Sequence, residues 1–304
     1  MPIFYMLLLL LTSLIWGGNF VVGKTLVSHA SPITLTTLRW AIAILFLFPL
    51  VLWKEKKFFP PRKAILPLII MGITGVALFN LFQFWALENT SATNVGLIST
   101  LNAISIAIFS SVFLKERLNV LQLFSMLLSF LGVVLVLTKG DMNLLFSMKF
   151  NVGDLFMLIA VCIWGLYSVC SRWATKTVSP IMATLYSGVF GLILIIPFNL
   201  TDFTISKVDT AFVVSILYTG VISTVLCMIF WNIGVQKIGA ITAGIFLNFN
   251  PIFTAILAFF ILGEKLSWIQ VIGSVIVIIG CYLFTYFKTH RILKNKIVLK
   301  DAVS

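Results

Sequence analysis

Amide and aromatic side chains recur at helical spacing inside the apolar stretches of this chain. Thr12, Trp16 and Asn19 are four and three residues apart, which places them on one face of a helix. Asn80 and Gln83 share a face in the same way. An amide can donate and accept hydrogen bonds, and an aromatic ring offers a large, rigid apolar surface. Together they favour non-covalent binding of a zwitterion or another polar metabolite.

We interpret a set of such residues as candidate substrate contacts, because polar groups inside a membrane are costly and mark either binding sites or helix packing. The set is Trp16, Asn19, Asn80, Gln83, Phe84, Asn94, Asn102, Trp164, Tyr167, Trp231, Asn248 and Asn250. For each amide the alternative is an interhelical hydrogen bond worth about 1 kcal/mol or less. For Trp16 and Trp164, cavity lining and structural packing are equal alternatives.

Groups that carry catalysis are not found within the apolar stretches. All nine Asp and Glu lie in expected loops, at the ends of these stretches or in the tail, and His29 and His290 lie in loop or tail. A lipid-modifying enzyme would need acidic or His-containing clusters for metal and acid–base chemistry. We therefore predict no enzyme activity, no cofactor and no metal site. The lack of a mid-membrane carboxylate also weakens the case for proton coupling and leaves facilitated export open.

The elements that position these residues follow from composition. The chain is 61% hydrophobic and 10% charged, with a mean hydropathy of +1.13. A soluble domain could not cover its surface with so few polar residues, so we predict an all-α polytopic membrane protein in a lipid bilayer. Its ten transmembrane helices are expected near 4–23, 32–53, 65–87, 92–114, 119–138, 153–173, 180–200, 211–234, 239–262 and 267–287.

The net charge of +12 is concentrated in the short loops and the tail. Most Lys and Arg fall on the inner side if the N-terminus is inside, so the positive-inside rule predicts that both termini are cytoplasmic. The basic residues therefore act as topology determinants and do not indicate nucleic-acid binding. The expected location is the cell (plasma) membrane, with multiple passes.

Some charged residues have other interpretations. Arg39 is placed deepest in an expected span, where it could pair with an anionic substrate; we adopt the alternative that it snorkels to the outer interface. Lys24 and Arg172 are interpreted as interface anchors at span ends. Glu116 and Glu264 follow expected spans in short loops with neighbouring cations. We interpret them as turn and gate elements on opposite membrane faces rather than as proton carriers.

The chain contains two copies of one unit. Residues 10–24 and 158–172 align at an offset of 148, with Trp16-Gly17 recurring as Trp164-Gly165. The offset holds without a gap through later pairs such as Gly132 and Gly280. Repeats of membrane helices are typical of transporters. In expected spans 5 and 10, Ser125 and Gly132, and their equivalents Gly273 and Gly280, predict close helix packing or a homodimer face.

Each copy holds five expected spans, which define the domains. The first repeat is expected at 4–138 and the second at 153–287, followed by a basic cytoplasmic tail at 288–304. Because five is odd, the second copy enters from the opposite side of the membrane. The repeat is therefore predicted to be inverted, with a pseudo-two-fold axis in the membrane plane, an architecture that suits alternating access.

Pro251 predicts a break in the helix that carries Asn250. Proline removes a backbone donor and frees a carbonyl about one turn earlier, near Leu247. That carbonyl could face substrate or form a hinge, or a neighbouring side chain could satisfy it. The matching residue in the first copy is Ala103, so we expect an asymmetric break, in the second copy alone.

Several motifs carry a resemblance to a known family. In the first copy they are Leu-Ile-Trp-Gly-Gly-Asn-Phe at 14–20, Ser-Pro at 31–32 with Arg39, Ala86-Leu87 leading to Thr90-Ser91-Ala92, and Leu-Lys-Glu-Arg-Leu at 114–118. In the second copy they are Ile-Trp-Gly at 163–165, Leu-Asn-Phe-Asn-Pro at 247–251 and Leu-Gly-Glu-Lys-Leu at 262–266. Over residues 4–287 the chain resembles the EamA-type two-repeat branch of the drug/metabolite transporter superfamily. The resemblance implies a ten-helix inverted-repeat fold whose cavity is lined by spans 1, 3, 4, 6, 8 and 9.

The expected function is secondary transport of a small-molecule substrate, with export of amino acids or related small metabolites by alternating access. One alternative is a carrier or exchanger of anionic substrates such as sugar-phosphates or nucleotide-sugars, which would need Arg or Lys inside the cavity. Another is a drug exporter. The second copy departs from the first where Asn19 becomes Tyr167 and Arg39 becomes Ser187, so the resemblance does not assign a substrate.

Overall fold

The computed structural model describes residues 2–55, 58–116, 118–141, 151–201, 203–262 and 267–301. Within these residues ten apolar helical stretches are long enough to cross a membrane, which confirms the predicted all-α membrane fold. The described part contains no strand beyond an isolated bridge between Ala30 and Ile205. Glu264, predicted to be a turn or gate element, lies outside the described residues.

The first five spans are built from eight helical segments. They are α1 (Pro2–Leu26), α2 (Pro32–Lys54), α3 (Arg62–Met71), η1 (Gly72–Leu78), α4 (Phe79–Asn89), α5 (Ala92–Ser99), α6 (Asn102–Phe113) and α7 (Val120–Thr138). Segments α3, η1 and α4 form one continuous span, and α5 and α6 form the next. The capping residues are those that favour helix starts: Ser91 accepts from the Asn94 amide, and Asn119 forms a capping box with Gln122.

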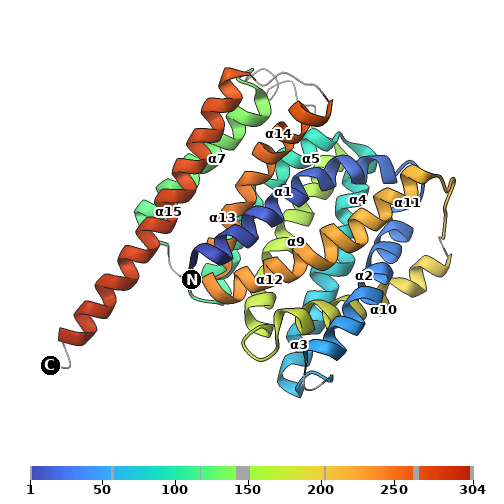
Figure 1. Cartoon of the computed structure of the whole chain (residues 1–304), viewed down its shortest axis with the longest axis horizontal. Helices are drawn as coiled ribbons and strands as arrows, with labels where there is room; N and C mark the ends of the chain where they lie inside the picture. Colours follow the sequence, from blue (N-terminus) through green and yellow to red (C-terminus); the bar gives the residue numbers. More distant parts are fainter. Residues whose placement is uncertain are drawn as a thin grey trace.

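The second five spans repeat this plan. They are α9 (Val152–Ala174), α10 (Pro180–Thr201), α11 (Thr210–Leu217), η2 (Tyr218–Leu226), α12 (Cys227–Ile238), α13 (Ala240–Ile245), η3 (Phe246–Phe249), α14 (Asn250–Leu262) and α15 (Trp268–Asp301). Segments α11, η2 and α12 form one span. Helix α15 continues past the predicted end of its span at residue 287 and projects from the bundle at the C-terminal end (Figure 1).

Helix contacts recur between the two copies: where two helices pack together, their equivalents in the other copy also pack together. Helix α7 packs against its equivalent α15, and α2 packs against its equivalent α10 (Figure 1). Helix α9 contacts α4 and α6, and its equivalent α1 contacts α12 and α14, which match α4 and α6 in the other copy. The two copies are thus interleaved rather than side by side, and residues at their interface come from both.

Small residues bring α7 and α15 together within the chain. A Cβ on Gly132 would lie 2.7 Å from the Gly273 carbonyl oxygen, and one on Gly280 would lie 2.7 Å from the Ser129 amide nitrogen. These contacts assign the predicted small-residue faces to packing between the two copies, because glycine lets the backbones approach closely.

Helix irregularities also occur in matched places. The π-helical segments η1 and η2 interrupt spans 3 and 8 at equivalent positions, beginning near Gly72 and Gly220. Span 9 is interrupted by the 3₁₀ segment η3, and span 4 is interrupted between Ser99 and Asn102. The prediction of a break in the second copy alone is therefore wrong. In span 4 no proline is needed, since the Ser99 and Thr100 hydroxyls donate to the carbonyls of Gly96 and Leu97.

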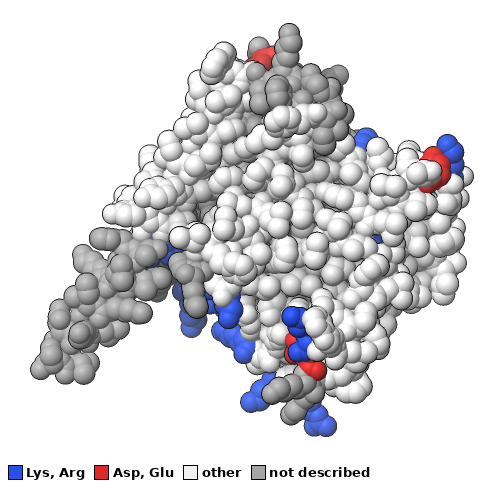
Figure 2. All heavy atoms as spheres, viewed as in Figure 1, with Lys and Arg blue, Asp and Glu red and all other residues white. Residues whose placement is uncertain are grey.

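Charged side chains gather toward the ends of the helices. Figure 2 shows Lys and Arg concentrated along the lower part of this face, with a broad and almost uncharged surface between the two ends. Large apolar side chains cover such surface: Leu45 is 72% exposed and Phe260 is 77% exposed. An exposed apolar belt of this kind is suited to contact with lipid chains rather than water.

Candidate functional site

A small cavity lies where the two copies meet. Its lining residues are Trp16, Asn19, Phe20, Arg39, Trp40, Gly75, Phe79, Asn80, Gln83, Asn102, Trp164, Met228, Leu247 and Asn250. They come from spans 1, 2, 3, 4, 6, 8 and 9, so both copies contribute. Its volume of about 40 Å³ is small beside the roughly 300–1,000 Å³ of typical ligand pockets.

The structure brings part of the predicted set to this cavity. The cavity-lining members are Trp16, Asn19, Asn80, Gln83, Asn102, Trp164 and Asn250. The members placed elsewhere are Phe84, Asn94, Tyr167, Trp231 and Asn248.

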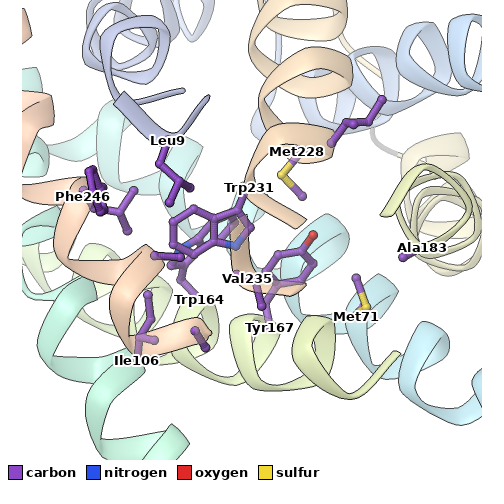
Figure 3. Close-up of a cluster of buried hydrophobic side chains, with 14 of the residues drawn as sticks. Leu9, Met71, Ile106, Trp164, Tyr167, Ala183, Met228, Trp231, Val235 and Phe246 are labelled. Atoms are coloured by element: carbon purple, nitrogen blue, oxygen red, sulfur yellow. The ribbon is translucent and has the colours of Figure 1, made fainter. Parts of the chain in front are cut away.

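Tyr167 and Trp231 lie behind the cavity wall. Both are fully buried, and the Tyr167 hydroxyl donates to Asn232 Oδ1 at 3.0 Å. The Tyr167 ring stacks on Trp164 with centroids 4.9 Å apart, and the Trp231 ring lies 5.5 Å from Trp164 and 5.8 Å from Trp16. Figure 3 shows Trp231 of α12 beside Trp164 and Tyr167, which both belong to α9. Tyr167 and Trp231 support the tryptophans that line the cavity, as an aromatic second layer.

Asn94, Asn248 and Phe84 are used for helix packing. Asn94 Nδ2 donates to Thr90 Oγ1 and Asp154 Oδ1, and Asn248 Nδ2 donates to Ser129 Oγ. Phe84 is buried in an apolar cluster of residues from α1, α4 and α9. For the two amides, the interhelical hydrogen bond stated above as an alternative is what the structure shows.

Arg39 is a cavity residue, so the prediction that it snorkels to the membrane interface is wrong. Its side chain is buried, with 6% exposed, and it lines the cavity from α2. Its Nε donates to Thr224 Oγ1 at 2.6 Å and its Nη2 donates to Ser223 Oγ at 3.3 Å. The adjacent hydroxyls in span 8 are the sequence signal for this placement, because they supply acceptors that draw the guanidinium inward.

A hydrogen-bond chain connects Arg39 to span 1. Ser223 Oγ donates to Asn19 Oδ1 at 2.9 Å, and the indole nitrogen of Trp16 donates to the Ser223 carbonyl at 2.9 Å. Nearby, the Tyr218 hydroxyl donates to the Ile15 carbonyl at 2.6 Å. One wall of the cavity is therefore fixed by bonds between α1 and η2.

The π-helical segments η1 and η2 position side chains of the cavity wall. In η2, Thr224 Oγ1 donates to the Thr219 carbonyl, five residues earlier, so the hydroxyl both stabilises the wide turn and accepts from Arg39. In η1, Asn80 Nδ2 donates to the carbonyls of Gly75 and Val76 at 2.9 Å. Such π-helical turns are frequent at functional sites because they aim neighbouring side chains differently from an α-helix.

Several polar atoms of the cavity wall have no hydrogen-bond partner among the described residues. The donors are Arg39 Nη1, Trp40 Nε1 and Trp164 Nε1, and the acceptors are Gln83 Oε1, Asn102 Oδ1 and Asn250 Oδ1. Buried polar atoms in native structures are almost always hydrogen-bonded. Donors and acceptors left open around one cavity are suited to a polar ligand.

A larger cavity of about 280 Å³, here called the vestibule, adjoins the first. It is lined by Phe20, Val21, Ala92, Gly96, Ser99, Val136, Leu137, Lys139, Asn250, Pro251, Thr254, Ala255 and Gln270. Phe20 and Asn250 line both spaces, so these two side chains separate the central cavity from the vestibule.

Fold and cavity together define a class: a multi-pass membrane protein built from two five-helix copies around a shared polar cavity. Comparison with known families gives the assignment. The model of the EamA-like transporter family matches residues 3–138 and 151–286. The chain belongs to the EamA-like transporter family, and this family and the ten-helix, two-repeat fold are those predicted from the sequence.

Related proteins align with almost the whole chain. An uncharacterized transporter of Archaeoglobus fulgidus is 32% identical over 281 residues, which cover 92% of this chain and 96% of the relative. The uncharacterized transporter YyaM of Bacillus subtilis is 30% identical and covers 90% of this chain and 91% of its own. One crystal structure aligns with 93% of this chain and 96% of its own at a TM-score of 0.74 and 18% identity, a similarity of fold.

Proposed function

We propose that this protein is a secondary transporter that exports an amino acid or a related small metabolite across the plasma membrane by alternating access. The observation that carries the proposal is the set of unpartnered buried donors and acceptors around the central cavity. Relatives named as transporters support the general class, and the chemistry of the cavity supports a polar substrate of small size.

The repeat architecture supports an alternating-access mechanism. Each copy has five spans, so the second begins on the opposite side if all ten cross the membrane. The helix contacts keep their pattern when the copies are exchanged. In an inverted repeat, such an exchange turns an opening on one side into an opening on the other. The cavity of about 40 Å³ must widen to hold a metabolite, and helix rearrangement would provide that space.

Orientation is part of the proposal. The bias of Lys and Arg toward one set of loops supports both termini in the cytoplasm. With that orientation, Lys139 lies at the outer end of span 5, and the vestibule that it helps to line lies in the outer half of the bundle. The direction of export is then from the cytoplasm, through the central cavity, into the vestibule.

A counterflow assay in proteoliposomes tests the proposal. Purified protein should exchange one or more compounds of a panel of amino acids and small metabolites. Asn102→Ala should reduce exchange by about tenfold because it removes an acceptor from the cavity wall, whereas Asn89→Ala, an exposed amide outside the cavity, should not. Wild-type exchange by Asn102→Ala, or no exchange of any panel compound by the wild type, would contradict the proposal.

A further inference from the structure

The guanidinium of Arg39 is a buried charge without a counter-charge. Among the described residues, no carboxylate forms an ion pair with Arg39; Asp209, for example, pairs with Lys207 and does not line the cavity. Its two partners are the neutral hydroxyls of Ser223 and Thr224. Hydroxyls satisfy donors, but they do not neutralise a charge, and an isolated charge inside a membrane is costly.

The bonding of Arg39 leaves one edge of the guanidinium for a ligand. Nε and Nη2 donate to the two hydroxyls, while Nη1 has no acceptor among the described residues; the Arg39 side chain as a whole lines the cavity. The neighbouring Trp40 adds a second open donor, its indole nitrogen. A planar guanidinium is the group that proteins use most often for carboxylates, and a donor held in place loses less entropy on binding.

The opposite chemistry is found on other helices of the same cavity. Gln83, Asn102 and Asn250 each present an amide oxygen that has no partner among the described residues. Amide oxygens bind an ammonium group without adding charge, and the rings of Trp16 and Trp164 lie beside them in the wall. The cavity wall therefore carries open donors, open acceptors and aromatic surface.

We propose that Arg39 binds a single carboxylate of the transported compound, and that the substrates are monocarboxylates with an ammonium or other donor group, such as neutral amino acids. This inference rests on the function proposed above and narrows its substrate class. Arg39 is the one Lys or Arg among the described cavity-lining residues. Compounds with two or more negative charges, such as sugar-phosphates, would bring charge that this wall does not neutralise.

The position of Arg39 also distinguishes the two copies. Its equivalent, Ser187, donates to the Thr184 carbonyl within α10 and does not line the cavity. Ser223 and Thr224 correspond to Gly75 and Val76, which have no hydroxyl. The carboxylate site is thus built once, on the α2–η2 side, and a substrate would bind in one orientation.

Binding to the full-length protein in detergent tests this directly. The probes are the common L-amino acids, L-phenylalaninamide as a carboxamide without the negative charge, and phenyl phosphate as a dianion, read by quenching of tryptophan fluorescence. Three tryptophans line the cavity, so binding there should change the signal. At least one neutral amino acid should bind, and L-phenylalaninamide and phenyl phosphate should bind about tenfold more weakly or not at all.

Substitutions of Arg39 test whether this side chain binds the carboxylate. Arg39→Gln should weaken amino-acid binding by about 10- to 100-fold. Arg39→Lys keeps the positive charge but loses the planar guanidinium, so its affinity should lie between those of Arg39→Gln and the wild type. Ser187→Ala should bind as the wild type does. Without ligand, Arg39→Gln should melt no lower than the wild type, because the variant removes an unneutralised charge; a purely structural arginine would lower the melting temperature.

The outcomes separate the two proposals. Binding that depends on Arg39, without counterflow, would reject transport of these compounds and keep the carboxylate site. Counterflow that is equal for a compound and its carboxamide, or is unchanged in Arg39→Gln, would overturn the role of Arg39 and keep transport. Failure of every amino acid to bind to the wild type would also overturn the carboxylate site.

Discussion

Gly75 shows how the absence of one carbon atom shapes the cavity. It lies in η1 and lines the cavity, and the ring of Tyr167 packs against its backbone. A Cβ at this position would lie 2.1 Å from Tyr167 Cδ2, well inside contact distance. Because the Tyr167 hydroxyl is fixed by Asn232, the ring has little freedom to move away. The second aromatic layer therefore depends on glycine here.

Gly75→Ala is expected to destabilise the protein by about 1–3 kcal/mol and to reduce counterflow, since overpacking would push Tyr167 and Trp164 into the cavity. The measurement is thermal unfolding in detergent, with counterflow in parallel. Gly96→Ala is the matched control, because nothing lies within 4 Å of a Cβ at that position. That control should leave transport unchanged. Equal melting temperatures for Gly75→Ala and the wild type would contradict the packing argument.

Only part of the cavity wall could be predicted from the sequence. Helical spacing identified Asn19, Asn80 and Gln83, because a shared face depends only on local periodicity. Arg39 could not be placed in this way, since its acceptor Ser223 is 184 residues away in the chain. Tyr167 was expected at the cavity for its type, but the amide of Asn232 binds its hydroxyl behind the wall.

Two equivalent cations close the ends of equivalent helices. Lys24, near the end of α1, donates to the carbonyls of Leu87 and Thr90 at the C-terminal end of α4. Arg172, near the end of α9, donates to the carbonyls of Val235 and Gln236 in the last turn of α12. The interface-anchor interpretation misses these bonds. The cations add hydrogen bonds to carbonyls at these helix ends and complement the helix dipole.

Lys24→Gln and Arg172→Gln should each loosen one helix end. Removing a charge-assisted hydrogen bond of about 1.5–3 kcal/mol should raise amide hydrogen exchange about tenfold or more at the end of α4 in the first variant and at the end of α12 in the second. Hydrogen–deuterium exchange with peptide resolution measures both. Each variant serves as the control for the other. Faster exchange at both ends in either variant would mean global loosening and contradict a local role.

Some of the helix ends and breaks could be predicted from the sequence, and others could not. The starts at Ser91, Asn119 and Asn151 follow from cap residues, whose side chains bond the first free amides. The π-helical segments η1 and η2 do not begin at such cap residues. Besides the local hydrogen bonds described above, they have close tertiary contacts: a Cβ on Gly72, for example, would lie 2.8 Å from the Gly191 amide nitrogen of α10.

Asp209, which caps α11 outside the membrane span, gives a pH dependence. The Phe212 amide, and then Lys207, hold the pKa of its carboxyl down from 3.8 to about 2. A carboxyl whose pKa is lowered by folding stabilises the fold above its unfolded pKa and loses that effect as pH falls toward the folded value. The stability advantage of the wild type over Asp209→Asn should therefore shrink between about pH 4 and pH 2.

Melting temperatures in acidic detergent buffers measure this difference. Ser91→Ala removes a cap that does not titrate, so its effect on stability relative to the wild type should stay constant over the same range. A difference between the wild type and Asp209→Asn that does not change with pH would contradict the carboxylate's role.

At the scale of the whole molecule, symmetry and asymmetry have different origins. The offset of 148 residues predicted two five-helix copies, because repeated length and hydropathy determine a repeated fold. The size of the cavity was not predictable, since it depends on how side chains from seven spans pack together. The vestibule meets the cavity at Phe20 and Asn250, whose equivalents are Ser168 and Asn102. The symmetric scaffold thus carries a path that is lined differently in each copy.

The proposed path through the vestibule predicts the effect of filling it. Gly96 lines the vestibule, and a Cβ there would meet no atom within 4 Å, so a large side chain should be accepted by the fold and occupy the open space. Gly96→Trp should reduce counterflow by about tenfold or more while leaving the melting temperature and amino-acid binding close to wild type. Gly96→Ala, which adds a methyl group only, should transport normally. Leu45→Trp, on the exposed apolar surface, controls for an added indole. Since the central cavity is left intact in all three variants, normal transport by Gly96→Trp would place the route for the substrate outside the vestibule.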